Sequence, residues 1–167
     1  MKNPSKNKIE LIRIGKHLNE IISIKDSAGN LLHKVVKPVM VELYPRDVMQ
    51  LIVGATLLSV PVSFTEEVWK LGVDLPWLNV ISIGLLSMLF VGLFVYYNFY
   101  RSHFKKHRIE FFKRIFATYI ISLSVVLILL LLLEKAPLGP DWPITLKRMI
   151  IIAFPASMSA AVADMIK

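Results

Sequence analysis

The stretch WLNVISIGLLSMLFVGLFVYYNFY, residues 77–100, decides the fold class of this chain, because it contains no charged residue. A helix of about 20 apolar residues crosses the roughly 30 Å hydrocarbon core of a membrane. With 55% hydrophobic residues and a mean hydropathy of +0.59, the 167-residue chain is too apolar for a soluble domain. The sequence therefore predicts an all-α integral membrane protein. It has four predicted transmembrane helices, at about 48–72, 77–100, 115–134 and 148–166.

The first 46 residues are polar and of mixed charge, so the predicted organisation is an N-terminal arm, 1–46, and a membrane domain, 47–167. The first apolar run begins too late for a cleaved signal peptide. Residues 20–25 and 31–38 favour strands and flank the turn-forming segment 26–30, which predicts a β-hairpin in the arm. We expect Asp47 to cap the first membrane helix.

The net charge of +8 is distributed unevenly along the chain. Nine Lys or Arg lie in residues 1–47 and six in 101–114, whereas the two opposite connections hold only Lys70, Lys135, Lys147 and Arg148. The positive-inside rule then places both termini and the 101–114 loop of a multi-pass protein in the cytoplasm. We expect that loop to attract anionic lipid, and we expect no nucleic-acid partner.

Two adjacent carboxylates, Glu66 and Glu67, end the first apolar run. Carboxylates near hydrocarbon are costly and commonly face a water path, a cation or a partner charge. On a helix the two project about 100° apart. Lys70 lies four residues after Glu66, so Glu67 is the freer acid. The alternative is that both are solvated at an exposed helix end. The candidate ion-pathway residues are Glu67, Glu66, Thr65 and Ser63.

Two prolines lie within predicted membrane helices, Pro61 in the first and Pro155 in the fourth. Proline frees a backbone carbonyl in a helix, so these are candidate gating kinks, with close structural packing as the alternative. Small residues in spans one, two and four predict tight helix packing there, with the third span as a lipid-facing cover. The candidate packing residues are Gly54, Gly84, Gly92, Ser157, Ala160 and Ala161.

Asp164, near the inner end of the fourth span, has two interpretations. It could end an ion path, or it could pair with Lys167 or with the basic 101–114 loop, and pairing is favoured. His103 and His107 share a helical spacing but lie among cations, so they are not expected to bind metal. Without catalytic, phosphate-binding or metal-binding motifs, we expect no enzyme activity, no cofactor and no metal site.

Two motifs carry a family resemblance: Pro61-x-x-x-Thr65-x-Glu67-x-Trp69-x-x-Gly72, and a second one that begins Pro155-Ala156-Ser157. They resemble a family of small prokaryotic integral membrane proteins catalogued as a domain of unknown function. The resemblance covers roughly residues 45–167, and the arm adds nothing to it. It implies an integral membrane fold and draws attention to Thr65, Glu67 and Trp69, without naming a substrate.

The leading functional hypothesis is a homo-oligomeric cation channel in a prokaryotic inner membrane, with a ring of Glu67 or Glu66 at the outer mouth. Converging carboxylates would favour divalent ions such as calcium, and their protonation would gate the path. Two alternatives stay open. One is a proton-coupled secondary transporter with its site between kinked spans, and the other is a non-transporting scaffold or sensor.

Overall fold

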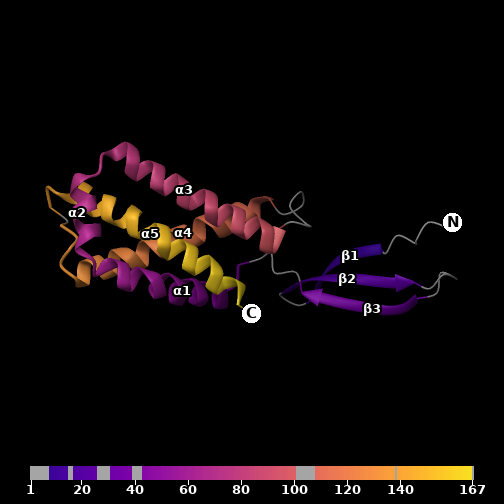
Figure 1. Ribbon diagram of the computed structural model, residues 1–167. Coiled ribbons are helices and arrows are strands. Elements are labelled where there is room, and N and C mark those ends of the chain that lie inside the picture. The colour runs from indigo at the N-terminus through magenta and orange to yellow at the C-terminus, as the bar shows by residue number, and fades with distance from the viewer. Residues whose placement is uncertain are drawn as a thin grey trace. The chain divides into compact units, whose positions relative to one another are not determined.

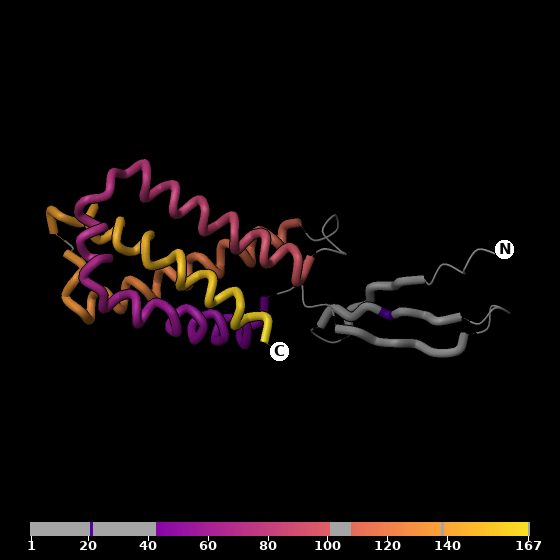
Figure 2. Tube along the Cα trace, viewed as in Figure 1, coloured from indigo at the N-terminus to yellow at the C-terminus, as the bar shows by residue number. Residues whose placement is uncertain are grey.

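The computed structural model describes residues 8–14, 17–25, 31–38, 43–100, 108–137 and 139–166. It divides into two compact units, Met1–Glu42 and Leu43–Lys167. Figure 2 follows the chain through the second unit, where each helix runs roughly antiparallel to the next long one.

The first unit contains a three-stranded antiparallel sheet in the order β1-β2-β3, formed by Lys8–Ile14, His17–Lys25 and Leu31–Pro38. Strands β2 and β3 pair from Asn19 opposite Pro38 to Lys25 opposite Leu31, with an irregularity at Ile24 and Lys25. The sequence-based hairpin covers these two strands, and β1 adds a third.

The second unit is helical, with long helices at Pro45–Ser63 (α1), Trp77–Val95 (α3), Arg108–Leu132 (α4) and Trp142–Met165 (α5). A short helix, α2, spans Glu66–Asp74, and a π-helical turn, η1, extends α3 over Tyr96–Tyr100. Within the described ranges, three helices are long and apolar enough to cross a membrane, at Trp77–Tyr100, Arg108–Leu132 and Trp142–Met165. A fourth crossing arises if α1 and α2 count as one broken span.

One end of this bundle, here called the α2 end, gathers α2, the α4–α5 connection and the first turns of α3 and α5 (Figure 1). The opposite end, here called the Arg114 end, gathers the start of α1, the turn η1, the start of α4 and the end of α5. Both ends place segments that are far apart in the sequence side by side.

The predicted continuous span over 48–72 is wrong, because the chain turns by 84° between α1 and α2. The last turn of α1 contains Pro61, and the helix ends two residues later. The Thr65 hydroxyl donates to the Val62 carbonyl at 2.8 Å, and the Trp69 indole donates to the Ser63 carbonyl at 2.9 Å. These two bonds satisfy carbonyls that the ended helix leaves without an intrahelical donor.

Helix α5 lies at the centre of the bundle and contacts α1, α2, α3 and α4. Its alanines meet α1 at Gly54, where an added Cβ would lie 2.5 Å from the Ala163 Cβ and 2.8 Å from the Ala160 Cα. Between α3 and α5, the buried hydroxyls of Ser87 and Ser157 are hydrogen-bonded at 2.8 Å. Small and hydroxyl-bearing residues therefore let the backbones approach closely, as expected where lipid removes the hydrophobic drive between helices.

The expected role of the third span as a lipid-facing cover is wrong for one face of it. Helix α4 packs against both α1 and α5 and buries a strip at every fourth residue. In that strip, the Thr118 hydroxyl donates to the Arg114 carbonyl and the Ser122 hydroxyl to the Thr118 carbonyl, at 2.9 and 2.8 Å. The least buried membrane helix is instead α3. The buried strip comprises Arg114, Thr118, Ser122, Val126 and Leu130.

Candidate functional site

At the Arg114 end, one guanidinium lies between two carboxylates from two other helices. Arg114 on α4 donates through Nε and Nη2 to Asp164 Oδ2 on α5, at 2.8 and 2.7 Å. Its Nη2 also lies 3.5 Å from Asp47 Oδ2 on α1. The three residues are only 1 to 2% exposed. We call Asp47, Arg114 and Asp164 the buried charge cluster.

Aromatic residues of η1 and a backbone amide complete the surroundings of this cluster. The Phe99 ring centroid lies 4.0 Å from the Arg114 Cζ, and the buried Tyr100 is hydrogen-bonded to the Arg114 side chain. The Tyr44 backbone amide donates to Asp47 Oδ2 at 3.1 Å. Burial removes the hydration of a charge, so a guanidinium at this depth requires charged and hydrogen-bonding partners. Helices α1 and α5 and the turn η1 supply these partners to Arg114 on α4.

The sequence anticipates this cluster in part. Pairing of Asp164 with the 101–114 segment is confirmed, since its partner is Arg114. Asp47 is not the N-cap residue of α1, because Tyr44 holds that position. Asp47 is the third residue of the helix, and its carboxylate still caps the helix start by accepting from the Tyr44 amide. The sequence interpretation missed Asp47 as a member of the cluster. It also placed Arg114 in a loop, although α4 begins at Arg108.

Basic side chains of α5 hold the α2 end together through neutral partners. Arg148 donates to the Trp69 carbonyl from Nε and Nη2, at 3.3 and 3.1 Å, and to the Lys135 carbonyl from Nη1 at 2.6 Å. Lys147 donates to the Leu75 carbonyl at 2.6 Å. Gly72 makes room for Arg148, because an added Cβ there would lie 2.4 Å from the Arg148 Cγ.

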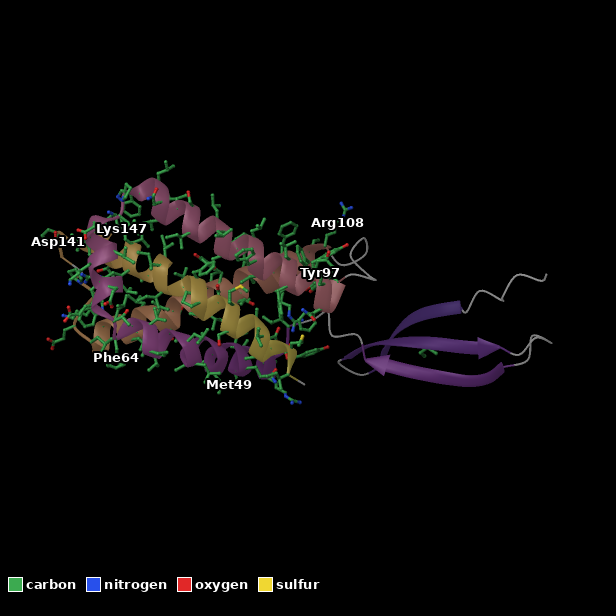
Figure 3. All side chains as sticks on the ribbon, viewed as in Figure 1. Met49, Phe64, Tyr97, Arg108, Asp141 and Lys147 are labelled. Carbon is green, nitrogen blue, oxygen red and sulfur yellow. The ribbon has the colours of Figure 1, made fainter. Side chains whose placement is uncertain are left out.

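Trp69 on α2 contacts three other segments at this end of the bundle. Its indole nitrogen bonds α1, its carbonyl accepts from Arg148, and the Lys135 ammonium lies 4.2 Å from the centroid of its ring. Trp69 therefore has three intramolecular partners in the structure. Figure 3 labels Lys147 and Asp141 at this end of the bundle, and Tyr97 and Arg108 at the other.

The predicted ion-pathway residues lie around the start of α2. Glu66 and Lys70 form an exposed ion pair at 3.6 Å, with the i to i+4 spacing expected from the sequence. Glu67 is exposed and lies one residue further round α2. Thr65 is the N-cap residue of α2. Ser63 is buried, and its hydroxyl has no hydrogen-bond partner among the described residues.

The remaining predicted residues are distributed through the bundle. Pro61 is exposed in the last turn of α1, and Pro155 is half-buried within α5. Of the proposed packing residues, Gly54 faces α5. An added Cβ at Gly84 would lie 3.2 Å from the Ile150 Cγ2, and one at Gly92 would lie 3.5 Å from the Ile115 Cδ1, an ordinary contact. Ser157, Ala160 and Ala161 are buried on α5. His103 and His107 lie outside the described residues.

A pocket of about 400 Å³ lies on one face of α2. Arg148 and Lys135 form its wall from α5 and the α4–α5 connection, opposite Glu66, Trp69, Lys70, Val73 and Asp74 of α2. Glu67 does not line this pocket. Within the described part of the chain, no group of three or more His, Cys, Asp or Glu is arranged to hold a metal ion.

The family model described as "Putative integral membrane protein (DUF2391)" matches residues 17–166. The chain belongs to this family. The DUF2391 match begins within the strand unit, at the start of β2, so the expected limit of the resemblance to 45–167 is too narrow. The comparisons find no matching protein of curated description and no matching solved structure.

Proposed function

We propose that this integral membrane protein is the subunit of a homo-oligomeric cation channel, in which Glu67 from each copy lines the outer mouth. The exposed carboxylate of Glu67 on α2 carries this proposal. Glu66 is paired with Lys70, whereas Glu67 is exposed and does not line the pocket, which leaves its carboxylate available to a pathway shared with other copies. Rings of carboxylates concentrate cations at a pore mouth.

The packing of the single chain supports a pathway between copies rather than through one bundle. Where α1 meets α5, Gly54 lies so close to Ala160 that even an added methyl group has no room. This contact leaves no room for a water path between α1 and α5 at that point. A symmetric ring of subunits encloses a central axis that one helix of each copy lines, so a short chain is enough to form a pore.

The proposed setting follows the charge distribution. We place the α2 end outside and both termini in the cytoplasm of a prokaryotic inner membrane, with anionic lipid at the 101–114 loop. Calcium or protons are the proposed cations, because converging carboxylates suit hard ions and titrate together. The proposed activity involves no enzymatic step and no cofactor.

Cation flux into proteoliposomes tests the channel. We expect Glu67→Gln to reduce flux at least tenfold, whereas the matched variant Glu66→Gln, which loses a neutralised carboxylate, retains most of it. Mass photometry or cross-linking in nanodiscs measures the number of copies. Monomers that conduct nothing, or equal flux in both variants, would overturn the proposal.

A proton-coupled secondary transporter is the second candidate, and the buried charge cluster favours it. Ionisable residues sealed between membrane helices often belong to proton relays, and this cluster joins two carboxylates to one guanidinium. Flux that saturates with substrate and requires a pH gradient would favour the transporter over the channel. Absence of any flux with intact assembly would leave the scaffold or sensor.

A further inference from the structure

We infer that the pocket on α2 binds a phosphate group, either from a lipid headgroup or as free phosphate, between Lys135 and Arg148. This site lies on the face of α2 that does not carry Glu67, so it stands apart from the proposed channel. Three features support it: the charges of Arg148 and Lys135 are not neutralised by a carboxylate of the described residues, their side chains are held in place, and the pocket is large enough for a phosphate group.

The two cations have neutral partners among the contacts of the described residues. Arg148 donates to the carbonyls of Trp69 and Lys135, and the Lys135 ammonium lies over the Trp69 ring. Carbonyls and an aromatic face orient a cation without cancelling its charge. By contrast, Lys70 on the same pocket is neutralised by Glu66. The charge presented by Arg148 and Lys135 therefore remains available to an anion.

These cations are also held in place before any ligand arrives. Three donated hydrogen bonds fix the Arg148 guanidinium, and Gly72 leaves the space through which its stem passes. Preorganised donors lose less entropy on binding. The planar guanidinium also suits the paired oxygens of a phosphate.

The dimensions and location favour a phosphate group. A volume of about 400 Å³ is in the range of small-ligand pockets and accommodates a headgroup. Val73 and Trp69 provide an apolar side, as a lipid at a membrane surface requires. Asp74 is the opposing feature, because its carboxylate also lines the pocket and repels an anion. Three cations against two carboxylates leave the lining positive.

Thermal unfolding of the full-length protein in an uncharged detergent tests the site. One arm adds phosphatidylglycerol, with diacylglycerol as the phosphate-free control. The other adds inorganic phosphate, with chloride at equal ionic strength as its control. Stabilisation by both phosphate-bearing additives identifies the phosphate group itself as sufficient, and stabilisation by the lipid alone identifies a headgroup site.

Two variants avoid the structural bonds of Arg148. We expect Lys135→Gln to weaken the phosphate-dependent stabilisation by about tenfold in apparent affinity, since one charge-assisted contact is worth roughly that factor. Asp74→Asn should strengthen it by removing repulsion. Lys113→Gln, which removes an equal charge from the exposed Glu110 pair at the Arg114 end, is the control for non-specific attraction.

The outcomes are decisive. Loss of the phosphate-dependent stabilisation in Lys135→Gln, together with its retention in Lys113→Gln, supports the site. A larger phosphate-dependent stabilisation in Asp74→Asn supports it independently. The inference is overturned if neither additive stabilises the protein beyond its control. It is also overturned if Lys135→Gln and Lys113→Gln respond alike, because the binding would then follow net charge alone.

Discussion

Arg114 shows how one residue can organise an entire end of a membrane bundle. Its guanidinium is 1% exposed and reaches carboxylates that lie 67 and 50 residues away in the sequence. The shorter contacts go to Asp164 and the longer one to Asp47. Removing one partner of a buried pair costs more than the pair itself contributes, because the remaining charge stays desolvated.

Asp164→Asn should therefore destabilise the bundle by about 3 to 5 kcal/mol. Asp47→Asn should cost less, because its contact with Arg114 is 3.5 Å and an amide oxygen can still accept from the Tyr44 amide. Unfolding in mixed micelles with increasing dodecyl sulfate, followed by circular dichroism, gives both free energies. Equal losses would contradict the ranking of the two contacts.

Gly54 lies where α1 and α5 pack closely together. In Gly54→Ala, the new methyl group would meet α5 at 2.5 to 2.9 Å, including the Ser159 carbonyl, so the helices must separate. Overpacking of this kind costs about 1 to 3 kcal/mol. Gly92→Ala is the matched control, because its Cβ would find an ordinary 3.5 Å contact with Ile115. The same unfolding titration should show a loss for the first variant only.

At the scale of elements, the break between α1 and α2 is stabilised by contacts from outside both helices. Pro61 weakens the end of α1, but α2 takes its position from the carbonyl bonds that Arg148 and Lys147 make at Trp69 and Leu75. A nine-residue helix is too short to be stable alone, so α2 depends on these attachments.

Trp69→Phe should loosen α2 while leaving the long helices intact. The substitution removes the indole bond to the Ser63 carbonyl and leaves that carbonyl without its described side-chain donor, at a cost of about 1 to 3 kcal/mol. Hydrogen exchange measured by mass spectrometry should rise across Glu66–Asp74 and stay unchanged in α5. Trp77→Phe, at a residue that is 40% exposed, controls for loss of an indole.

At the scale of the whole molecule, the strand unit and the helical unit are each compact. The helical core includes Leu51 and Ala55 of α1, Val126 and Leu130 of α4, and Ile152 of α5, all of them fully buried. The helical unit thus has its own core, as an independently folding domain requires.

Removal of residues 1–42 should therefore leave the helical unit folded. We expect the truncated chain to insert into membranes and to unfold within a few degrees of the full-length protein, as measured by thermal scanning in detergent. A large drop in unfolding temperature would show instead that the strand unit contributes to the stability of the bundle.

The sequence alone determined the class of this protein and the positions of its apolar helices, because hydropathy over about 20 residues is a local property. It also predicted the Glu66–Lys70 pair, whose spacing is local to one helix, and the pairing of Asp164 with a basic segment. The family match agrees with the membrane assignment.

The burial of particular charges and the choice of helix neighbours depend on contacts between distant parts of the chain. Arg114 belongs to a run of surface-like cations in the sequence, and its burial depends on Asp47 and Asp164 arriving from two other helices. Likewise, Trp69 connects α2 to α5 because Arg148, which lies 79 residues later in the sequence, donates to its carbonyl. Such contacts depend on the close approach of distant helices, which small residues permit but no local pattern specifies.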